Sequence, residues 1–172
     1  MNIEHLQYPI GPFKAPQRYN QAVVDEAISI LKLFPQQLRA LVANLPKETL
    51  DTPYRPGGWT IRQVVHHLAD SHHHSYSRFK WALTEENPTI KAYQEKDWAE
   101  LEDAKVTPIA WSLTHIEVLH QKIVQMLEGF GKEEWNKTFI HPQTKHVFTL
   151  KELACMYAWH SMHHYMHIKN AL

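Results

Sequence analysis

Glycines are few in this chain, and its turn signals divide it into four long helical segments. The 172 residues include only five glycines, and runs of alternating apolar and polar residues are rare, which argues against a mainly β architecture. Thr60 and Thr149 each stand three residues before a Gln or Glu, which is the pattern of a capping box that opens a helix. Thr107 followed by Pro108 is a further helix start. These signals predict an all-α fold.

The positions of the expected helices follow from these signals. They cover approximately residues 20–45, 60–83, 108–129 and 149–170. Pro35 predicts a kink or break in the first of them, because proline has no N–H and clashes with the preceding turn. Asn87-Pro88 ends the second and starts a polar connection that is too long for a tight helix-helix turn. Residues 139–141 and 146–148 flank a turn, which indicates a short hairpin. We therefore expect residues 1–172 to form one domain, an up-down-type four-helix bundle with a hairpin before the last helix.

Composition limits the classes of function and the kinds of metal site. Lys and Arg together number 18, as do Asp and Glu, so the chain has no basic field for nucleic acid or an anionic membrane. No apolar run approaches the roughly 20 residues of a membrane span, and the N-terminus lacks the pattern of a signal peptide. We therefore expect a soluble, cytoplasmic protein. The single cysteine, Cys155, excludes an intramolecular disulfide and a cysteine-based zinc cluster, which leaves histidine as the metal-binding residue type.

The last predicted helix carries a pair of histidines four residues apart, His160 and His164. Two imidazoles at this spacing point the same way from a helix and can share one metal ion. Winding the helix at about 100° per residue places the pair on its apolar stripe and places His163 and His167 to one side. The other residues of that stripe are Leu150, Leu153, Tyr157 and Ile168. The inner pair predicts two ligands of a metal site.

A third ligand has to come from another segment, and residues 66–74 contain five histidines. Winding the second predicted helix places His72 near the centre of its apolar stripe and His67 at one flank. Winding alone favours His72, but a flanking residue can also reach a site between two helices of a bundle. Composition and spacing therefore leave the third ligand open between His67 and His72.

A second apolar face of the last predicted helix bears on association. Trp159, Met162 and Met166 lie away from the stripe that contains His160 and His164. An apolar face of this size is costly to leave in water, which predicts a symmetric homodimer. The alternative is that long loops of the same chain cover it.

Two separated motifs resemble those of a known family. They are RPGGWTIRQVVHHLADS at residues 55–71 and YAWHSMHH at residues 157–164, and the similarity extends almost from end to end of the chain. This pattern looks like the YfiT branch of the DinB-like superfamily. The resemblance implies a four-helix bundle in which three histidines hold one divalent metal, and the matching positions are His67, His160 and His164. It also implies metal-dependent hydrolysis, while other relatives join low-molecular-weight thiols to electrophiles.

Three imidazoles without a fourth protein ligand favour a catalytic metal, because structural zinc sites close all four positions. A cation held in this way can lower the pKa of bound water or of a thiol substrate, so the site suits hydrolysis of a small molecule or, as the runner-up, thiol S-transfer. Imidazole suits zinc or nickel. Asp70 is a candidate hydrogen-bond acceptor one turn after His67, and Glu95 in the long connection is a candidate base. A non-catalytic, metal-stabilised binding module is the alternative outside enzymes.

The other histidines of the two motif regions are expected to be half-buried polar residues of amphipathic helices. They are His66, His72, His73, His74, His163 and His167.

Overall fold

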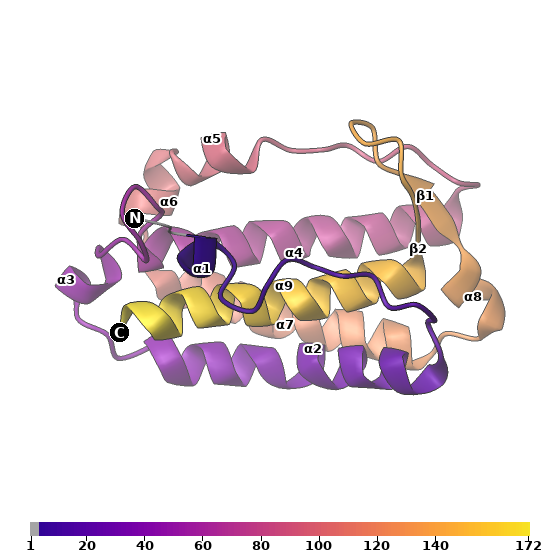
Figure 1. The fold of residues 1–172 in the computed structure, drawn as a ribbon, viewed down its shortest axis with the longest axis horizontal. Helices are drawn as coiled ribbons and strands as arrows, with labels where there is room; N and C mark the ends of the chain where they lie inside the picture. Colours follow the sequence, from indigo (N-terminus) through magenta and orange to yellow (C-terminus); the bar gives the residue numbers. More distant parts are fainter. Residues whose placement is uncertain (1–3) are drawn as a thin grey trace.

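The computed structural model describes residues 4–172, which form a bundle of four long helices with shorter elements at its ends and along one side (Figure 1). The long helices are α2 (Gln21–Val42), α4 (Ile61–Thr84), α7 (Ile109–Glu128) and α9 (Leu150–Ala171). The short helices are α1 (Glu4–Gln7), α3 (Lys47–Leu50), α5 (Glu95–Ala99), α6 (Glu102–Val106) and α8 (Lys132–Asn136). The four predicted helices are thereby confirmed, and the long polar connection contains α5 and α6.

A short antiparallel hairpin precedes α9, as expected. Strand β1 (Thr138–Ile140) pairs with β2 (Val147–Thr149), and Phe139 stands opposite Phe148. The rings of these two phenylalanines stack with centroids 5.2 Å apart. The Thr149 hydroxyl then accepts from the Glu152 N–H at 3.2 Å and caps the start of α9. The hairpin therefore leads directly into the helix that carries His160 and His164.

The helices do not alternate in direction throughout the bundle. The N-termini of α4 and α7 meet where Arg62 donates to the Thr107 carbonyl at 3.1 Å. The segment after α4 lies at the opposite end, where the Ile90 N–H donates to the Ile140 carbonyl of β1 at 3.1 Å. Residues 85–108 then return along the length of the bundle, so α4 and α7 are parallel (Figure 1). The expected up-down order therefore holds from α2 to α4 and from α7 to α9, whereas the long crossover interrupts it between α4 and α7.

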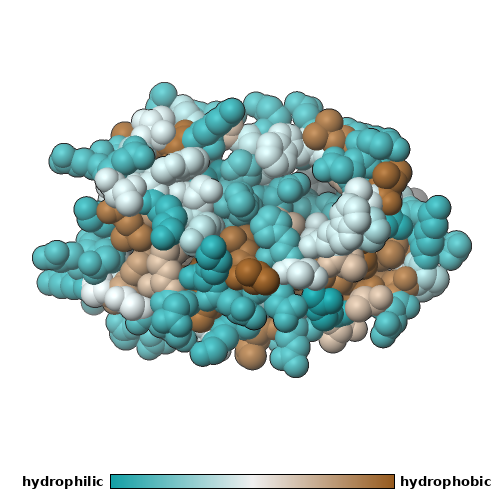
Figure 2. All heavy atoms as spheres, turned by 180° about the vertical axis from the view of Figure 1, so that it is seen from behind, coloured by the Kyte–Doolittle hydropathy of each residue, from teal (hydrophilic) through white to brown (hydrophobic). Residues whose placement is uncertain are grey.

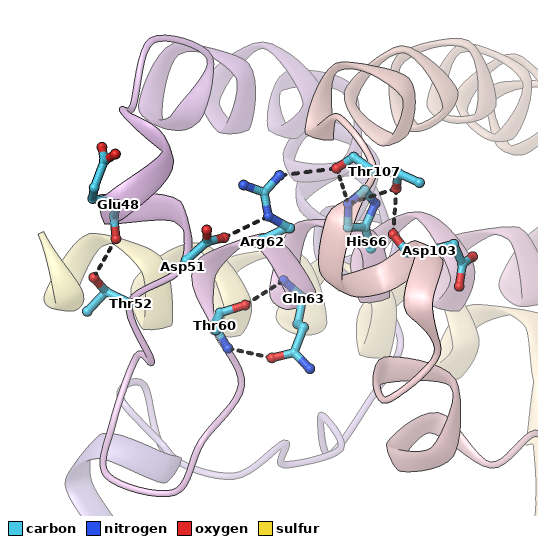
Figure 3. Close-up of polar contacts among 9 residues, drawn as sticks. All are labelled: Glu48, Asp51, Thr52, Thr60, Arg62, Gln63, His66, Asp103 and Thr107. Carbon is cyan, nitrogen blue, oxygen red and sulfur yellow. Dashed lines mark hydrogen bonds and ion pairs between the residues drawn. The ribbon is translucent and has the colours of Figure 1, made fainter.

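The start of α4 is fixed by a network of polar contacts with α3 and with the end of α6 (Figure 3). The Thr60 hydroxyl accepts from the Gln63 N–H at 3.2 Å, and the Gln63 side chain accepts from the Thr60 N–H at 2.8 Å, which completes the predicted capping box. Arg62 pairs with Asp51 at 2.8 Å and also donates to the Thr107 carbonyl. These contacts fix the helix just ahead of its histidine-rich turns.

Helix α2 continues through Pro35 without a break. Proline lacks the N–H that would donate to the carbonyl four residues earlier, so the Leu31 oxygen has no helical donor. The buried His120 of α7 lies at this oxygen, with its Nδ1 atom 2.6 Å away. A side chain of a neighbouring helix therefore satisfies the carbonyl that Pro35 leaves free.

Two apolar clusters make up the core, one toward each end of the bundle. The cluster toward the hairpin includes Phe79, Leu127, Phe139 and Leu153, and the other includes Phe34, Leu68, Ile116 and Ile168. Along α9, residues 160–167 fall between Ala158 of the first cluster and Ile168 of the second. The histidine-rich part of α9 therefore lies in the gap between two packed regions.

The face on which α7 lies is mostly hydrophilic, with small scattered apolar patches (Figure 2). Trp111 and Val118 of α7 are 66% and 52% exposed. None of the helices described for residues 4–172 combines the length and the apolar character needed to cross a membrane.

Candidate metal centre

Three histidines from α4 and α9 converge at one place in the structure. His160 and His164 lie one turn apart on α9, with ring centroids 4.5 Å apart. His67 of α4 faces both of them, and its Nε2 atom is 3.3 Å from that of His160. One ring nitrogen from each residue falls within 4.8 Å of the other two. The structure therefore brings together the three histidines that the family resemblance singles out, in a group that could hold a metal ion.

The separation of the two Nε2 atoms fits a shared cation. Zinc binds imidazole nitrogen at about 2.0 to 2.1 Å, so two ligands at a tetrahedral angle lie about 3.3 Å from each other. The nitrogens of His67 and His160 stand at that distance. The ring of Trp59 packs against His67 with centroids 4.8 Å apart and restricts its rotation. The rings of His67 and His160 therefore need to move little to bind one ion.

The second ring nitrogen of each of the three histidines has a neighbour of its own. His67 Nδ1 lies 3.5 Å from the Tyr93 hydroxyl, His160 Nδ1 lies 3.3 Å from His72 Nε2, and His164 Nδ1 lies 3.2 Å from His167 Nδ1. Histidines that bind metals almost always donate their other N–H to a carboxylate, a main-chain carbonyl or water, which fixes the tautomer and the orientation of the ring. Here a hydroxyl and two imidazoles take that place.

The hydrogen bonds behind His160 form a chain whose direction is set by a carbonyl. The Leu31 oxygen can only accept, so His120 donates to it from Nδ1 and keeps a lone pair on Nε2. His72 Nδ1 lies 2.9 Å from that Nε2 and donates to it, and the remaining His72 nitrogen then accepts from His160 Nδ1. As long as these imidazoles are neutral, the lone pair of His160 is left on Nε2, the atom that faces His67.

The same reasoning applies to His164. His167 Nε2 lies 3.0 Å from the Gln7 carbonyl and donates to it, so its Nδ1 atom accepts from His164 Nδ1. The lone pair of His164 is then left on Nε2. Both histidines from α9 are therefore set in the same tautomer by chains that end on main-chain oxygens.

Burial keeps the converging imidazoles neutral. Burial, together with the positive charges that His163 and His167 would carry, lowers the pKa of His67 to about 4. Burial likewise holds the pKa values of His160 and His164 well below the usual range. Neutral imidazole is the form that binds metals, so the cluster is ready to act as a ligand set at neutral pH.

A second group of histidines lies on α9, and no pattern in the sequence singles it out as a metal site. His163, His164 and His167 are all buried, and their ring nitrogens also lie within 4.8 Å of one another. His167 already bonds to the Gln7 carbonyl and to His164, so it is better placed to orient His164 than to bind an ion itself. The expectation that His163 and His167 are half-buried was wrong, because Tyr8 packs against His163, and Gln7 and Tyr54 contact His167.

The other histidines of α4 have varied surroundings. His66 is buried and lies 2.7 Å from the Ser112 hydroxyl and 3.2 Å from the Thr107 carbonyl. The expectation that His66 and His72 are half-buried was therefore wrong, since His66 packs against α7 and His72 lies among α2, α7 and α9. His73 is exposed beside His115, and His74 stacks on Tyr93.

The two acidic candidates lie in different places. Glu95 begins α5 and lines the cavity in front of His67 and His160. Asp70 is half-buried, and burial, aided by the nearby charge of Asp103, raises the pKa of its carboxyl group to about 6. Among the described residues, the Tyr93 hydroxyl rather than Asp70 is the hydrogen-bond partner of the outer nitrogen of His67.

Two cavities meet at this cluster. A cavity of about 740 Å³ is lined by all three histidines and by the charged side chains of Arg55, Glu95 and Lys96. A second cavity of about 490 Å³ also borders His160 and is lined by Arg78 and Tyr157. His160, Trp159 and the start of α5 border both. The cluster is therefore reachable by a small molecule.

The second apolar face of α9 is partly covered by the same chain. The Trp159 indole donates to the Gly11 carbonyl at 3.3 Å, and its ring packs against Phe13 with centroids 5.9 Å apart. Met162 and Met166 are half-buried. The segment between α1 and α2 thus provides the alternative covering that the sequence left open, and it runs along α9 (Figure 1).

Comparison with known proteins agrees with this fold. The family model described as the DinB superfamily matches residues 30–168. The chain is 44% identical over 168 residues to "Putative metal-dependent hydrolase YfiT" of Bacillus subtilis (strain 168), covering 98% of this chain and 94% of that protein. It is 47% identical over 166 residues to a Bacillus cereus (strain 03BB102) protein named "Putative metal-dependent hydrolase", covering 96% and 95%.

A solved structure is also similar. It is that of YfiT from Bacillus subtilis, described as "a probable metal-dependent hydrolase with an unusual four-helix bundle topology". It matches with a TM-score of 0.95 and 43% identity, and the match covers 97% of this chain and 95% of that one. With a family match over most of its length and close relatives along almost all of it, this chain belongs to the DinB superfamily and is of the YfiT type.

Proposed function

We propose that this chain is a metal-dependent hydrolase of small molecules in which His67, His160 and His164 hold one divalent cation. The observation that carries the proposal is the convergence of three neutral imidazoles whose outer nitrogens are all engaged by other groups. Imidazole donors suit zinc or nickel. The names of the relatives support metal dependence and hydrolysis.

A cation held by His67, His160 and His164 would supply a lowered pKa for the attacking water. The chain supplies the rest. Glu95, at the edge of the cavity, accepts a proton from the attacking water. Asp70, a carboxyl group with a raised pKa on the same helix as His67, acts through its charge on Tyr93, whose hydroxyl lies beside His67 Nδ1. Trp59 and Trp159 restrict access of bulk water to the histidines.

Thiol S-transfer is the second candidate, and the size of the cavity favours it. About 740 Å³ is enough for a large hydrophilic thiol beside the histidines, and Arg55 and Lys96 provide polar contacts. A non-catalytic binding module would need a fourth protein ligand to close the coordination sphere. The cluster that contains His67 has three members among the described residues.

Metal analysis and spectroscopy test the proposal first. The purified protein should contain about one divalent ion per chain, and cobalt substituted at the site should give a spectrum that changes when azide or a small thiol is added. A spectrum that ignores saturating azide and thiol, with a fourth side chain on the metal in a crystal structure, would exclude the enzyme.

An activity screen then separates the two enzyme reactions. The metal-loaded protein should hydrolyse members of a panel of esters, amides and phosphoesters, and a Glu95→Gln variant should keep its metal but lose rate by about 100-fold or more. Turnover confined to pairs of a thiol and an electrophile would replace hydrolysis by S-transfer. An Asp97→Asn variant is the matched control, since it makes the same change at another exposed carboxylate of the same cavity wall, and it should leave the rate unchanged.

A further inference from the structure

Arg78 is a buried arginine that forms no ion pair with any carboxylate of residues 4–172. Its side chain lies on α4, about three turns after His67, and only 8% of its surface is exposed. One guanidinium nitrogen donates to the Tyr157 hydroxyl at 3.2 Å, and the Nε–H is enclosed without a hydrogen-bond acceptor among the described residues. Most of its hydrogen-bonding capacity is therefore unused.

A second buried arginine of the same helix shows the usual arrangement. Arg62 is 7% exposed, pairs with Asp51 at 2.8 Å and donates to the Thr107 carbonyl. Buried charges are normally paired in this way, because an unpaired charge loses the solvation of water without any compensation. The lack of a protein carboxylate beside Arg78 therefore points to a partner that comes from outside the chain.

The guanidinium of Arg78 lines the cavity of about 490 Å³ that reaches His160. His141, which follows β1, lines the same cavity, and its Nδ1 atom is a second enclosed nitrogen without a partner among residues 4–172. Burial lowers the pKa of His141, and the positive charge of Arg78 lowers it further, so the two groups act on each other across this space. Glu95 and Asp97 also border the cavity, but both are exposed and neither forms an ion pair with Arg78.

We propose that Arg78 and His141 form an oxyanion-binding subsite, which holds a carboxylate or phosphate group of the substrate while its reacting part lies at His160. A guanidinium binds either group through two parallel N–H donors, which a lysine cannot do. This inference rests on the proposed function, because it places the reacting part of the substrate at His160, and it narrows the substrate to an anionic small molecule. Anion binding by Arg78 and His141 does not itself require a metal.

Titration of the full-length protein with inorganic phosphate and, separately, with succinate tests the subsite by NMR. The Nε–H resonance of Arg78, assigned by its loss in Arg78→Lys, should shift on addition of one of these anions. Arg78→Met should weaken binding by about 10- to 100-fold and Arg78→Lys by less, because lysine keeps the charge but not the paired donors. The anion that shifts the resonance distinguishes a carboxylate subsite from a phosphate subsite.

Arg62→Lys is the matched control, since it alters a buried arginine of α4 that already has a carboxylate. It should leave anion binding unchanged. If Arg78→Met does not fold, the resonance of Arg78 in the unaltered protein still decides the question. Failure of both anions to shift it, or equal binding by the folded Arg78→Met variant, overturns the subsite.

The same titration on metal-free protein separates this inference from the proposed function. Anion binding at Arg78 should persist after the metal is removed with a chelator, and Arg78→Met should still bind about one metal per chain. Anion binding that disappears with the metal would assign the anion to the cation and overturn the subsite. A protein that binds no metal but shifts the Arg78 resonance would instead overturn the hydrolase and leave the subsite in place.

Discussion

The Nδ1 atom of His120 lies 2.6 Å from the main-chain oxygen of Leu31, the carbonyl that Pro35 leaves without a helical donor. Because this oxygen can only accept, it sets the tautomer of His120, then that of His72 and finally that of His160. A proline in α2 and a candidate metal ligand in α9 are thereby connected through three hydrogen bonds. The conformation of one helix determines which nitrogen of a histidine on another faces the site.

Replacing His120 by phenylalanine should destabilise the protein by about 1 to 3 kcal/mol, because the Leu31 carbonyl stays buried and loses its donor. Adding Pro35→Ala should restore part of this stability, since the new N–H at position 35 can donate to Leu31 as in an ordinary helix, while His72 Nδ1 still lacks its acceptor. Urea unfolding of the two proteins measures the difference. Equal stability of the single and double variants would contradict this account of Pro35.

Replacing His72 by phenylalanine removes the acceptor for His160 Nδ1 and keeps a ring of similar size. Metal affinity should fall by about 10- to 100-fold, because the tautomer and orientation of His160 are no longer fixed. Competition with a chelator measures the affinity, and long-range ¹H–¹⁵N spectra report the tautomer directly. His73→Phe alters an exposed histidine that is paired with His115, and it should leave both readouts unchanged.

The two histidine groups on α9 can be told apart by single substitutions. His160 belongs only to the group with His67, whereas His167 belongs only to the group with His163. His160→Ala should abolish stoichiometric metal binding, and His167→Ala should weaken it by about 10- to 100-fold, because His167 only orients His164. Metal analysis after dialysis measures both. If His167→Ala abolished metal binding and His160→Ala only weakened it, the metal site would instead be formed by His163, His164 and His167.

The metal-free protein should lose stability in mild acid. Burial lowers the pKa of His120 to about 4, so the unfolded chain takes up a proton below about pH 6.5 that the folded chain does not bind. The neutral, buried histidine makes its full contribution to the free energy of unfolding above pH 6.5. This contribution is lost as the pH falls toward 4, by about 1.4 kcal/mol per pH unit for each such histidine. His67 behaves in the same direction. Urea unfolding between pH 7.5 and 4.5 measures this slope, and a flat profile would contradict it.

The homodimer stays a prediction, and the structure limits the surface on which it rests. Phe13 and Gly11 contact Trp159, and Trp159, Met162 and Met166 are all half-buried, so only part of that face is available to a partner. Sedimentation equilibrium at micromolar concentration should give twice the chain mass of 20.2 kDa, and Met162→Glu should shift it toward the monomer. A single species of 20.2 kDa for the unaltered protein would reject the dimer.

The sequence by itself determined the local elements, because their signals act within one or two turns. The capping boxes at Thr60 and Thr149 begin α4 and α9 as predicted. The spacing of His160 and His164 placed both on one side of α9, since a helix brings residues four apart onto the same face. Pro35 predicts a kink or break because it lacks an N–H. In the structure, His120 of α7 donates to the Leu31 carbonyl in place of that N–H, and no pattern within α2 predicts a donor from another helix.

Only the tertiary structure decided how His67 and His72 share the neighbourhood of His160. Winding favoured His72 and the family resemblance favoured His67, and the structure places His67 at Nε2 of His160 and His72 at Nδ1. These pairs are 93 and 88 residues apart in the chain, so their contacts depend on the packing of α4 against α9. The burial of His167 and the lack of a carboxylate beside Arg78 also depend on which distant segment covers a helix face. The periodicity within a single helix does not predict such contacts.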